Sequence, residues 1–148
     1  MNDHEAMGAA LNEAARAVLH RDVPIGAVCL IGGEVVARRH NERELRQDPT
    51  AHAEMLVLAD AAATAGSWRL TDATVVVTLE PCPMCAGGLF AARVRSVVFG
   101  ATDPKAGSCG TLYNLCADPR LNHEIEVTGG IRAEESAALL RDFFAGRR

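Results

Sequence analysis

The chain has 148 residues, 49% of them hydrophobic and 23% charged, with 15 Lys and Arg against 19 Asp and Glu. One domain over residues 1–148 is expected, and this apolar content excludes long disorder. The net charge of −4 excludes a general nucleic-acid binder, so an RNA partner must meet local groups of basic residues. There is no apolar run of the ~20 residues that cross a bilayer, and the acidic N-terminus is unlike a signal peptide. We therefore expect no membrane association and a cytoplasmic protein with reduced cysteines.

Helical and extended patterns alternate along the chain. In the first half we expect a helix containing Met7, Leu11 and Val18, strands over 23–31 and 34–37, a loop over 41–49 and a helix over 51–65. A strand over 75–77, a helix from Pro81 to about Ala92 and a strand over 97–99 should follow. The rest of the chain should form a glycine-rich loop over 101–110, a helical turn near Tyr113, a strand over 125–127 and a helix over 134–145. Strands that alternate with helices predict an α/β fold, a three-layer α/β/α sandwich.

Two short motifs carry metal-ligating residue types. His52 belongs to Thr50-Ala51-His52-Ala53-Glu54, and Cys82 and Cys85 belong to Glu80-Pro81-Cys82-Pro83-Met84-Cys85. A catalytic zinc ion takes three protein ligands and keeps a fourth position for water. Each of these three residues lies at the start of a predicted helix, so two positive helix ends would face one metal. The sequence therefore predicts one Zn²⁺ per chain, bound by His52, Cys82 and Cys85.

Glu54 lies two residues beyond the histidine and could reach the metal's water without ligating the metal. It would act as the proton shuttle, taking a proton from water and passing it to a leaving amino group. His-x-Glu followed by Pro-Cys-x-x-Cys is the known signature of the zinc deaminases of nucleobases, so here the sequence matches a described pattern. Glu54 is therefore the predicted catalytic residue.

The cysteines allow another interpretation. Cys82, Cys85, Cys109 and Cys116 could form a structural zinc site, although six residues separate the last two, more than such sites usually have. That arrangement would leave His52 and Glu54 without a role. Cys29 lies in an apolar predicted strand and is expected to be packed in the core.

The likeness extends beyond the metal motif. The chain resembles the bacterial tRNA adenosine deaminases, which convert the wobble adenosine of an anticodon to inosine. The stretches that carry the resemblance are residues 22–28, 48–54, 77–87, 98–101, 121–123 and 139–144. The metal motif is shared by all cytidine deaminase-like enzymes, whereas Asn122-His123 and Phe143-Phe144 are more specific to this group.

The resemblance implies a mixed five-stranded sheet between helices, a homodimer and a base lying over the zinc. It implies that Asn41 hydrogen-bonds to the substrate nucleoside and that the loop with Asp103 and Lys105 approaches the RNA, as does Phe144. The full set of substrate contacts expected in this way is Asn41, Ala53, Pro81, Asp103, Lys105, Asn122 and Phe144.

The expected function is hydrolytic deamination of the wobble adenosine in a tRNA anticodon stem-loop. Basic residues at 38–46, Lys105 and residues 141–148 are expected to border the active-site mouth and to meet RNA phosphates. One alternative is a salvage deaminase of a free base or nucleoside, guanine first and then cytosine. Another is a non-catalytic RNA- or partner-binding domain in which zinc only stabilises the fold. Glu54 argues against the latter, because a structural zinc site has no use for that carboxylate.

Overall fold

The computed structural model describes residues 1–147. Its elements are α1 (Asp3–Ala17), the 3₁₀ turn η1 (Val18–His20), β1 (Gly26–Ile31), β2 (Glu34–His40), α2 (Arg43–Arg46), α3 (Ala53–Ala65), β3 (Ala73–Leu79), α4 (Pro83–Ala91), β4 (Ser96–Ala101), β5 (Glu126–Thr128) and α5 (Ala133–Ala145). The predicted alternation of helices and strands is confirmed.

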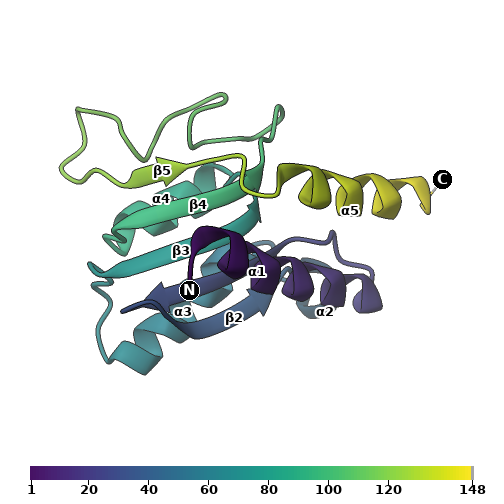
Figure 1. The fold of residues 1–148 in the computed structure, drawn as a ribbon, viewed down its shortest axis with the longest axis horizontal. Helices are drawn as coiled ribbons and strands as arrows, with labels where there is room; N and C mark the ends of the chain where they lie inside the picture. Colours follow the sequence, from purple (N-terminus) through teal and green to yellow (C-terminus); the bar gives the residue numbers. More distant parts are fainter. Residues whose placement is uncertain (148) are drawn as a thin grey trace.

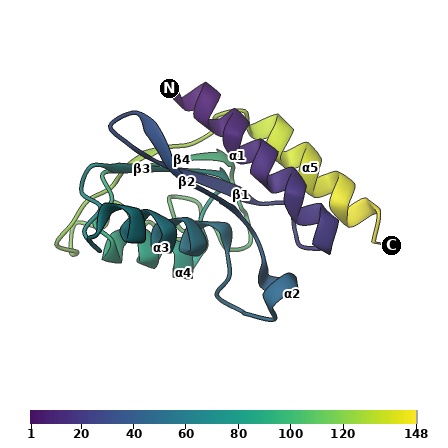
Figure 2. The same cartoon turned by 90° about the horizontal axis from the view of Figure 1, so that it is seen from below.

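The strands form one mixed five-stranded sheet in the order β2-β1-β3-β4-β5. β1 is antiparallel to both β2 and β3, whereas β4 is parallel to β3 and to β5. Helices α1 and α5 lie side by side on one face, and α3 and α4 cover the other (Figures 1 and 2). The predicted three-layer α/β/α sandwich is therefore confirmed. Among the described residues, no helix combines the length and apolarity needed to span a membrane.

The central strands are buried on both faces, which explains their nearly continuous apolar sequences. Alternate residues of β3 belong to different hydrophobic clusters: Val75 and Val77 face α3 and α4, whereas Val76 packs with α1. Cys29 of β1 is fully buried, as expected, and burial raises the pKa of its thiol to about 11. The parallel β3 and β4 both end at the same edge of the sheet, where α4 begins.

Some predicted boundaries were wrong. β1 begins at Gly26 rather than at Val23, because the preceding segment contains Pro24, which cannot donate to a strand ladder. The predicted loop over 41–49 contains the short helix α2, and β2 continues to His40. Near Tyr113 there is no helical turn; an isolated bridge between Cys109 and Asn114 closes this loop instead.

Candidate active site

His52 is held at the N-terminus of α3 by a compact turn. Asp48 Oδ1 accepts hydrogen bonds from Thr50 N (2.9 Å) and Thr50 Oγ1 (2.8 Å), and Ala51 O accepts one from Glu42 N (3.0 Å). This turn leaves His52 as the N-cap with extended backbone angles, and the helix proper starts two residues later than predicted. The imidazole therefore projects from the point at which the first N–H groups of α3 emerge.

Cys82 and Cys85 occupy the corresponding place on α4. Cys82 is the N-cap, and Cys85 lies in the first turn. Pro83, and not Pro81 as predicted, occupies the first helical position, where the missing N–H would have had no intrahelical partner. Two helix N-termini, those of α3 and α4, thus converge on one place and favour negative charge there.

The three predicted ligands come together as one group. His52 Nδ1 lies 3.7 Å from Cys82 Sγ and 3.5 Å from Cys85 Sγ, and all three ligand atoms lie within 4.8 Å of one another. Nitrogen and sulfur donors of a tetrahedral zinc ion, at their usual bond lengths, stand about 3.6 Å apart. The residues therefore fit a zinc ion, bound through Nδ1 of the histidine and both sulfur atoms.

The two sulfur atoms also interact with each other. A hydrogen bond from the Cys85 thiol lowers the pKa of Cys82 to about 4, whereas the same bond and burial raise the pKa of Cys85. The hydrogen bond to Cys82 also raises the pKa of His52. These interactions favour the thiolate form of Cys82, and a divalent cation would displace the remaining thiol proton.

Glu54 lies in the first turn of α3 and is only 4% exposed. Burial raises the pKa of its carboxyl to about 7, and the negative charge of Cys82 acts in the same direction. A general base transfers protons best when its pKa is close to the working pH. Glu54 therefore has the position and the acidity of a proton shuttle.

Beside these groups is a small cavity of about 100 Å³, lined by Val23, Ile25, Asn41, Arg43, His52, Ala53 and Glu54. Asn41 is buried and already bonded on both sides, donating to Val23 O (3.3 Å) and accepting from Arg43 N (3.1 Å). One N–H and one oxygen lone pair of its amide are left for a ligand. Ala53 contributes the first N–H of α3, which has no intrahelical acceptor.

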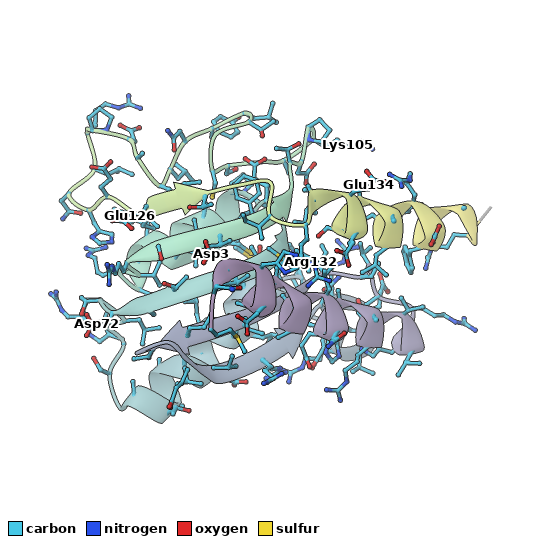
Figure 3. All side chains as sticks on the ribbon, in the orientation of Figure 1. Asp3, Asp72, Lys105, Glu126, Arg132 and Glu134 are labelled. Carbon is cyan, nitrogen blue, oxygen red and sulfur yellow. The ribbon has the colours of Figure 1, made fainter. Side chains whose placement is uncertain are left out.

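A second cavity of about 310 Å³ adjoins the first, because Val23 lines both. It brings together three of the predicted substrate contacts, Asp103, Lys105 and Phe144. Figure 3 shows Lys105 at the end of the sheet where α5 starts, opposite the end that carries Asp72 and Glu126. The loop and the C-terminal helix therefore form one wall beside the metal-ligating group.

Two of the predicted substrate contacts are not among the residues that line these cavities. Pro81 is buried, and its carbonyl oxygen accepts a hydrogen bond from Ser108 N (2.9 Å). Asn122 precedes His123, whose ring donates to Val94 O (2.9 Å) just before β4. Neither cavity is lined by Pro81 or Asn122, and their contacts with the substrate stay predictions.

Sequence reasoning missed the residues that hold the α2 segment beside the first cavity. Asp22 is fully buried, and its carboxylate accepts hydrogen bonds from Glu44 N (2.7 Å) and Leu45 N (3.1 Å). It thereby fixes the segment that carries Asn41 and Arg43. The sequence signal that could have indicated this role is Asp22 itself, a lone acidic residue directly before the apolar residues 23–31.

Fewer basic residues line the cavities than the sequence predicted. Arg39 forms ion pairs with Asp60 (3.0 Å) and Glu42 (2.9 Å), and Arg46 pairs with the same Glu42 (3.2 Å). In the C-terminal group, Arg141 pairs with Glu134 (2.6 Å), Arg147 lies over the Phe143 ring, and Arg148 is outside the described residues. Of the predicted basic residues, Arg43 and Lys105 line the cavities themselves.

The alternative site with four cysteines is not formed. Cys109 Sγ lies 3.2 Å from Cys116 Sγ, and both residues are buried. Within residues 1–147, the group of His, Cys, Asp and Glu side chains that could hold a metal consists of His52, Cys82 and Cys85. The Cys109–Cys116 pair is therefore separate from the predicted metal site.

Comparisons with known proteins agree with this geometry. The whole chain, residues 1–148, matches the MafB19-like deaminase family. A solved structure from work on A-to-I editing by deaminases at the wobble position of transfer RNA has a TM-score of 0.88 and 40% identity, covering 92% of this chain and 99% of its own. The guanine deaminase of Bacillus subtilis has a TM-score of 0.67 and 33% identity over 69% of this chain and 66% of its own. The fold and the site thus define a nucleobase deaminase.

A relative with higher sequence identity shows to which group of nucleobase deaminases the chain belongs. The tRNA-specific adenosine deaminase of Bacillus subtilis is 52% identical over 96% of this chain and 88% of its own length. The chain belongs to the tRNA-specific adenosine deaminases, and the resemblance inferred from the sequence is confirmed.

Proposed function

We propose that this protein, as one deaminase domain over residues 1–148, hydrolyses the 6-amino group of a tRNA adenosine at the anticodon wobble position. One observation carries the proposal: Glu54 and the metal donor His52 line the same cavity, and Cys82 and Cys85 lie next to His52. The relative at 52% identity supports the choice of tRNA adenosine as substrate. Thiolate ligands require a reducing compartment, so we place the enzyme in the cytoplasm.

The reaction needs a nucleophile, a proton shuttle and a held base. His52, Cys82 and Cys85 would hold Zn²⁺, which would supply a nucleophile at neutral pH by acidifying water. Glu54 would accept a proton from the attacking water as the water oxygen adds to C6 of the adenine. Glu54 then gives a proton to the amino nitrogen, the C6–N bond breaks, and ammonia leaves with inosine as the product. Asn41 orients the nucleoside through the unused capacity of its amide.

RNA binding is assigned to the wall around the two cavities. Arg43 and Lys105 line the two cavities, and we expect Arg43 to meet a phosphate beside the target nucleotide and Lys105 a second one further along the RNA loop. The exposed Phe144 ring offers a surface on which a flanking base can stack. A loop nucleotide is already partly unstacked, which lowers the cost of turning it into the first cavity.

Reversing the charge at Arg43 tests this wall. Arg43→Glu is expected to raise KM for an anticodon stem-loop and to reduce the salt slope of binding by about 0.7 for each phosphate that the variant no longer neutralises. The zinc content should stay unchanged. Arg95→Glu is the matched control, because Arg95 directly precedes β4 at the far edge of the sheet. Equal KM values and salt slopes in the two variants would contradict the assignment.

A salvage deaminase of free guanine is the second candidate, favoured by the 33% identity with a guanine deaminase. The two functions are separated by comparing a stem-loop, free guanine and free adenosine as substrates of the same preparation. We expect rapid, salt-dependent deamination of the stem-loop and little or none of free guanine. Rapid deamination of guanine without salt dependence would favour the salvage function.

A homodimer is also proposed. Leu89 of α4 is buried in its own chain and cannot reach a partner. Instead, α3 and α4 border an apolar groove of about 400 Å³, lined by Met55, Leu58, Ala59, Ala62, Trp68, Leu70, Gly88, Ala91 and Ala92. Trp68 in this groove is 58% exposed, as is typical of a residue that packs against a second copy.

Light scattering at micromolar concentration should give a dimer for the wild-type chain and a monomer for Trp68→Glu, because a charge would be buried at the interface. Leu19→Glu is the control, since Leu19 is also exposed but lies in η1, outside the groove. A monomeric wild-type protein, or a dimeric Trp68→Glu variant, would count against this interface.

A further inference from the structure

Glu80 is a buried carboxylate that the proposed reaction does not use. It follows the last residue of β3 and comes two residues before the ligand Cys82. Its side chain is 2% exposed. A buried carboxylate is stable only where several donors satisfy its oxygens, so its partners indicate what it holds in place.

All its partners come from one loop. Glu80 Oε1 accepts hydrogen bonds from Asp103 N (3.1 Å) and from the Thr111 hydroxyl. Glu80 Oε2 accepts from Cys109 N (3.1 Å) and Thr111 N (3.1 Å). Residues 103 and 111 bracket the first part of the connection between β4 and β5, so a single carboxylate closes residues 103–111 into a loop. An ionised carboxylate only accepts, and each of the four groups here donates.

Residues between 103 and 111 pack tightly against the Glu80 carboxylate. A Cβ at Gly107 would collide with the Glu80 carboxylate and with Asp103 O, so a side chain at this position would displace one of them. Asp103 Oδ1 accepts from Lys105 N (2.9 Å), which sets the position of Lys105 on the tip of the loop. Ser108 N donates to Pro81 O and ties the loop to the residue between Glu80 and Cys82.

We propose that Glu80 is a positioning residue that fixes the loop with Asp103 and Lys105 against the RNA while leaving the metal ligands unaffected. The inference deepens the proposed function and rests on it, because the loop matters only if RNA is the substrate. Asp103 and Lys105 line the second cavity, so a displaced loop changes binding of the nucleotides around the target base. The chemistry at C6 takes place in the first cavity, which the loop does not line.

Glu80→Gln is the direct test, because glutamine keeps the volume but presents an N–H₂ group to two of the donors. In zinc-loaded protein we expect KM for an anticodon stem-loop to rise about 10-fold, the effect of losing a hydrogen bond to a charged acceptor. The zinc content should be unchanged and kcat should remain within about 3-fold, since the loop contributes to binding rather than to the reacting atoms. Gly107→Ala should shift KM in the same direction through its clash with the carboxylate.

Amide hydrogen exchange supplies a measurement that does not depend on activity. The amides of Asp103, Cys109 and Thr111 donate to Glu80, so they should exchange faster in Glu80→Gln than in the wild type. Glu13→Gln is the matched control, because Glu13 is also buried but bonds to Arg16 and His40 on the other side of the sheet. The exchange of the three loop amides in this variant should match the wild type.

The outcomes separate the two proposals. Unchanged exchange of the three amides in Glu80→Gln would overturn the loop anchor, whatever the RNA assay gives. Loss of zinc and of kcat with KM unchanged would also overturn it, because Glu80 would then support the metal site. If exchange accelerates but the wild-type protein does not deaminate the stem-loop, the anchor stands and the proposed function fails.

Discussion

Replacement of Glu54 by alanine is expected to lower the deamination rate by about 10²–10⁴-fold, the usual contribution of a positioned proton shuttle. Glu54 serves both the attacking water and the departing amine, so the loss should fall at the upper end of this range. The zinc content should remain at the wild-type level, because the carboxylate is not one of the three converging donors. Single-turnover kinetics with a stem-loop and metal analysis of the same sample check both expectations.

Glu54→Gln separates the chemical role from packing. Glutamine fills the same buried volume at the start of α3, so the thermal stability should change little, yet it cannot take up a proton. The rate should fall nearly as far as in Glu54→Ala. A rate within a few-fold of wild type in either variant would show that another group moves the proton.

Replacement of Cys82 by alanine is expected to remove most of the bound metal. Purified wild-type protein should hold close to one zinc per chain, and two remaining donors cannot retain an ion that three share. Atomic absorption of protein dialysed against a chelator measures the difference. Activity should fall together with the zinc content.

Two other cysteines provide controls for this experiment. Cys29→Ala removes a buried thiol in β1 that is not one of the three converging donors, and it should leave zinc unchanged. Cys109→Ala should also keep zinc, because Cys109 faces Cys116 and not the metal-ligating group. Full zinc in Cys82→Ala would refute the ligand assignment, and loss of zinc in Cys109→Ala would restore the site with four cysteines.

The metal-ligating group was predictable because its geometry is local. His52 and Glu54 are two residues apart at a helix start, and Cys82 and Cys85 are three apart at another, so only the meeting of the two segments had to be inferred. The five-stranded sheet was expected from the alternating pattern and the resemblance. The sequence did not predict that β2 continues beyond Ala37, because this edge strand ends with the polar residues Arg38 to His40.

Features that depend on partners distant in sequence could not be predicted in this way. Arg39 was expected to face RNA, but Asp60, 21 residues further along on α3, pairs with it. The sequence placed Glu80 beside the cysteine motif without indicating its bonds to residues 103–111. Such pairings are decided by how the segments pack, so neither periodicity nor spacing reveals them.

The two walls of the site are held by different buried carboxylates, so each wall can change independently of the other. Asp22 holds the α2 segment and Glu80 holds the 103–111 loop, and neither belongs to the converging donors His52, Cys82 and Cys85. Mutations that reshape either wall should therefore change which substrate is bound while leaving these three donors in place. Laboratory evolution toward new bases should accordingly select changes in these two segments and leave the three converging donors untouched.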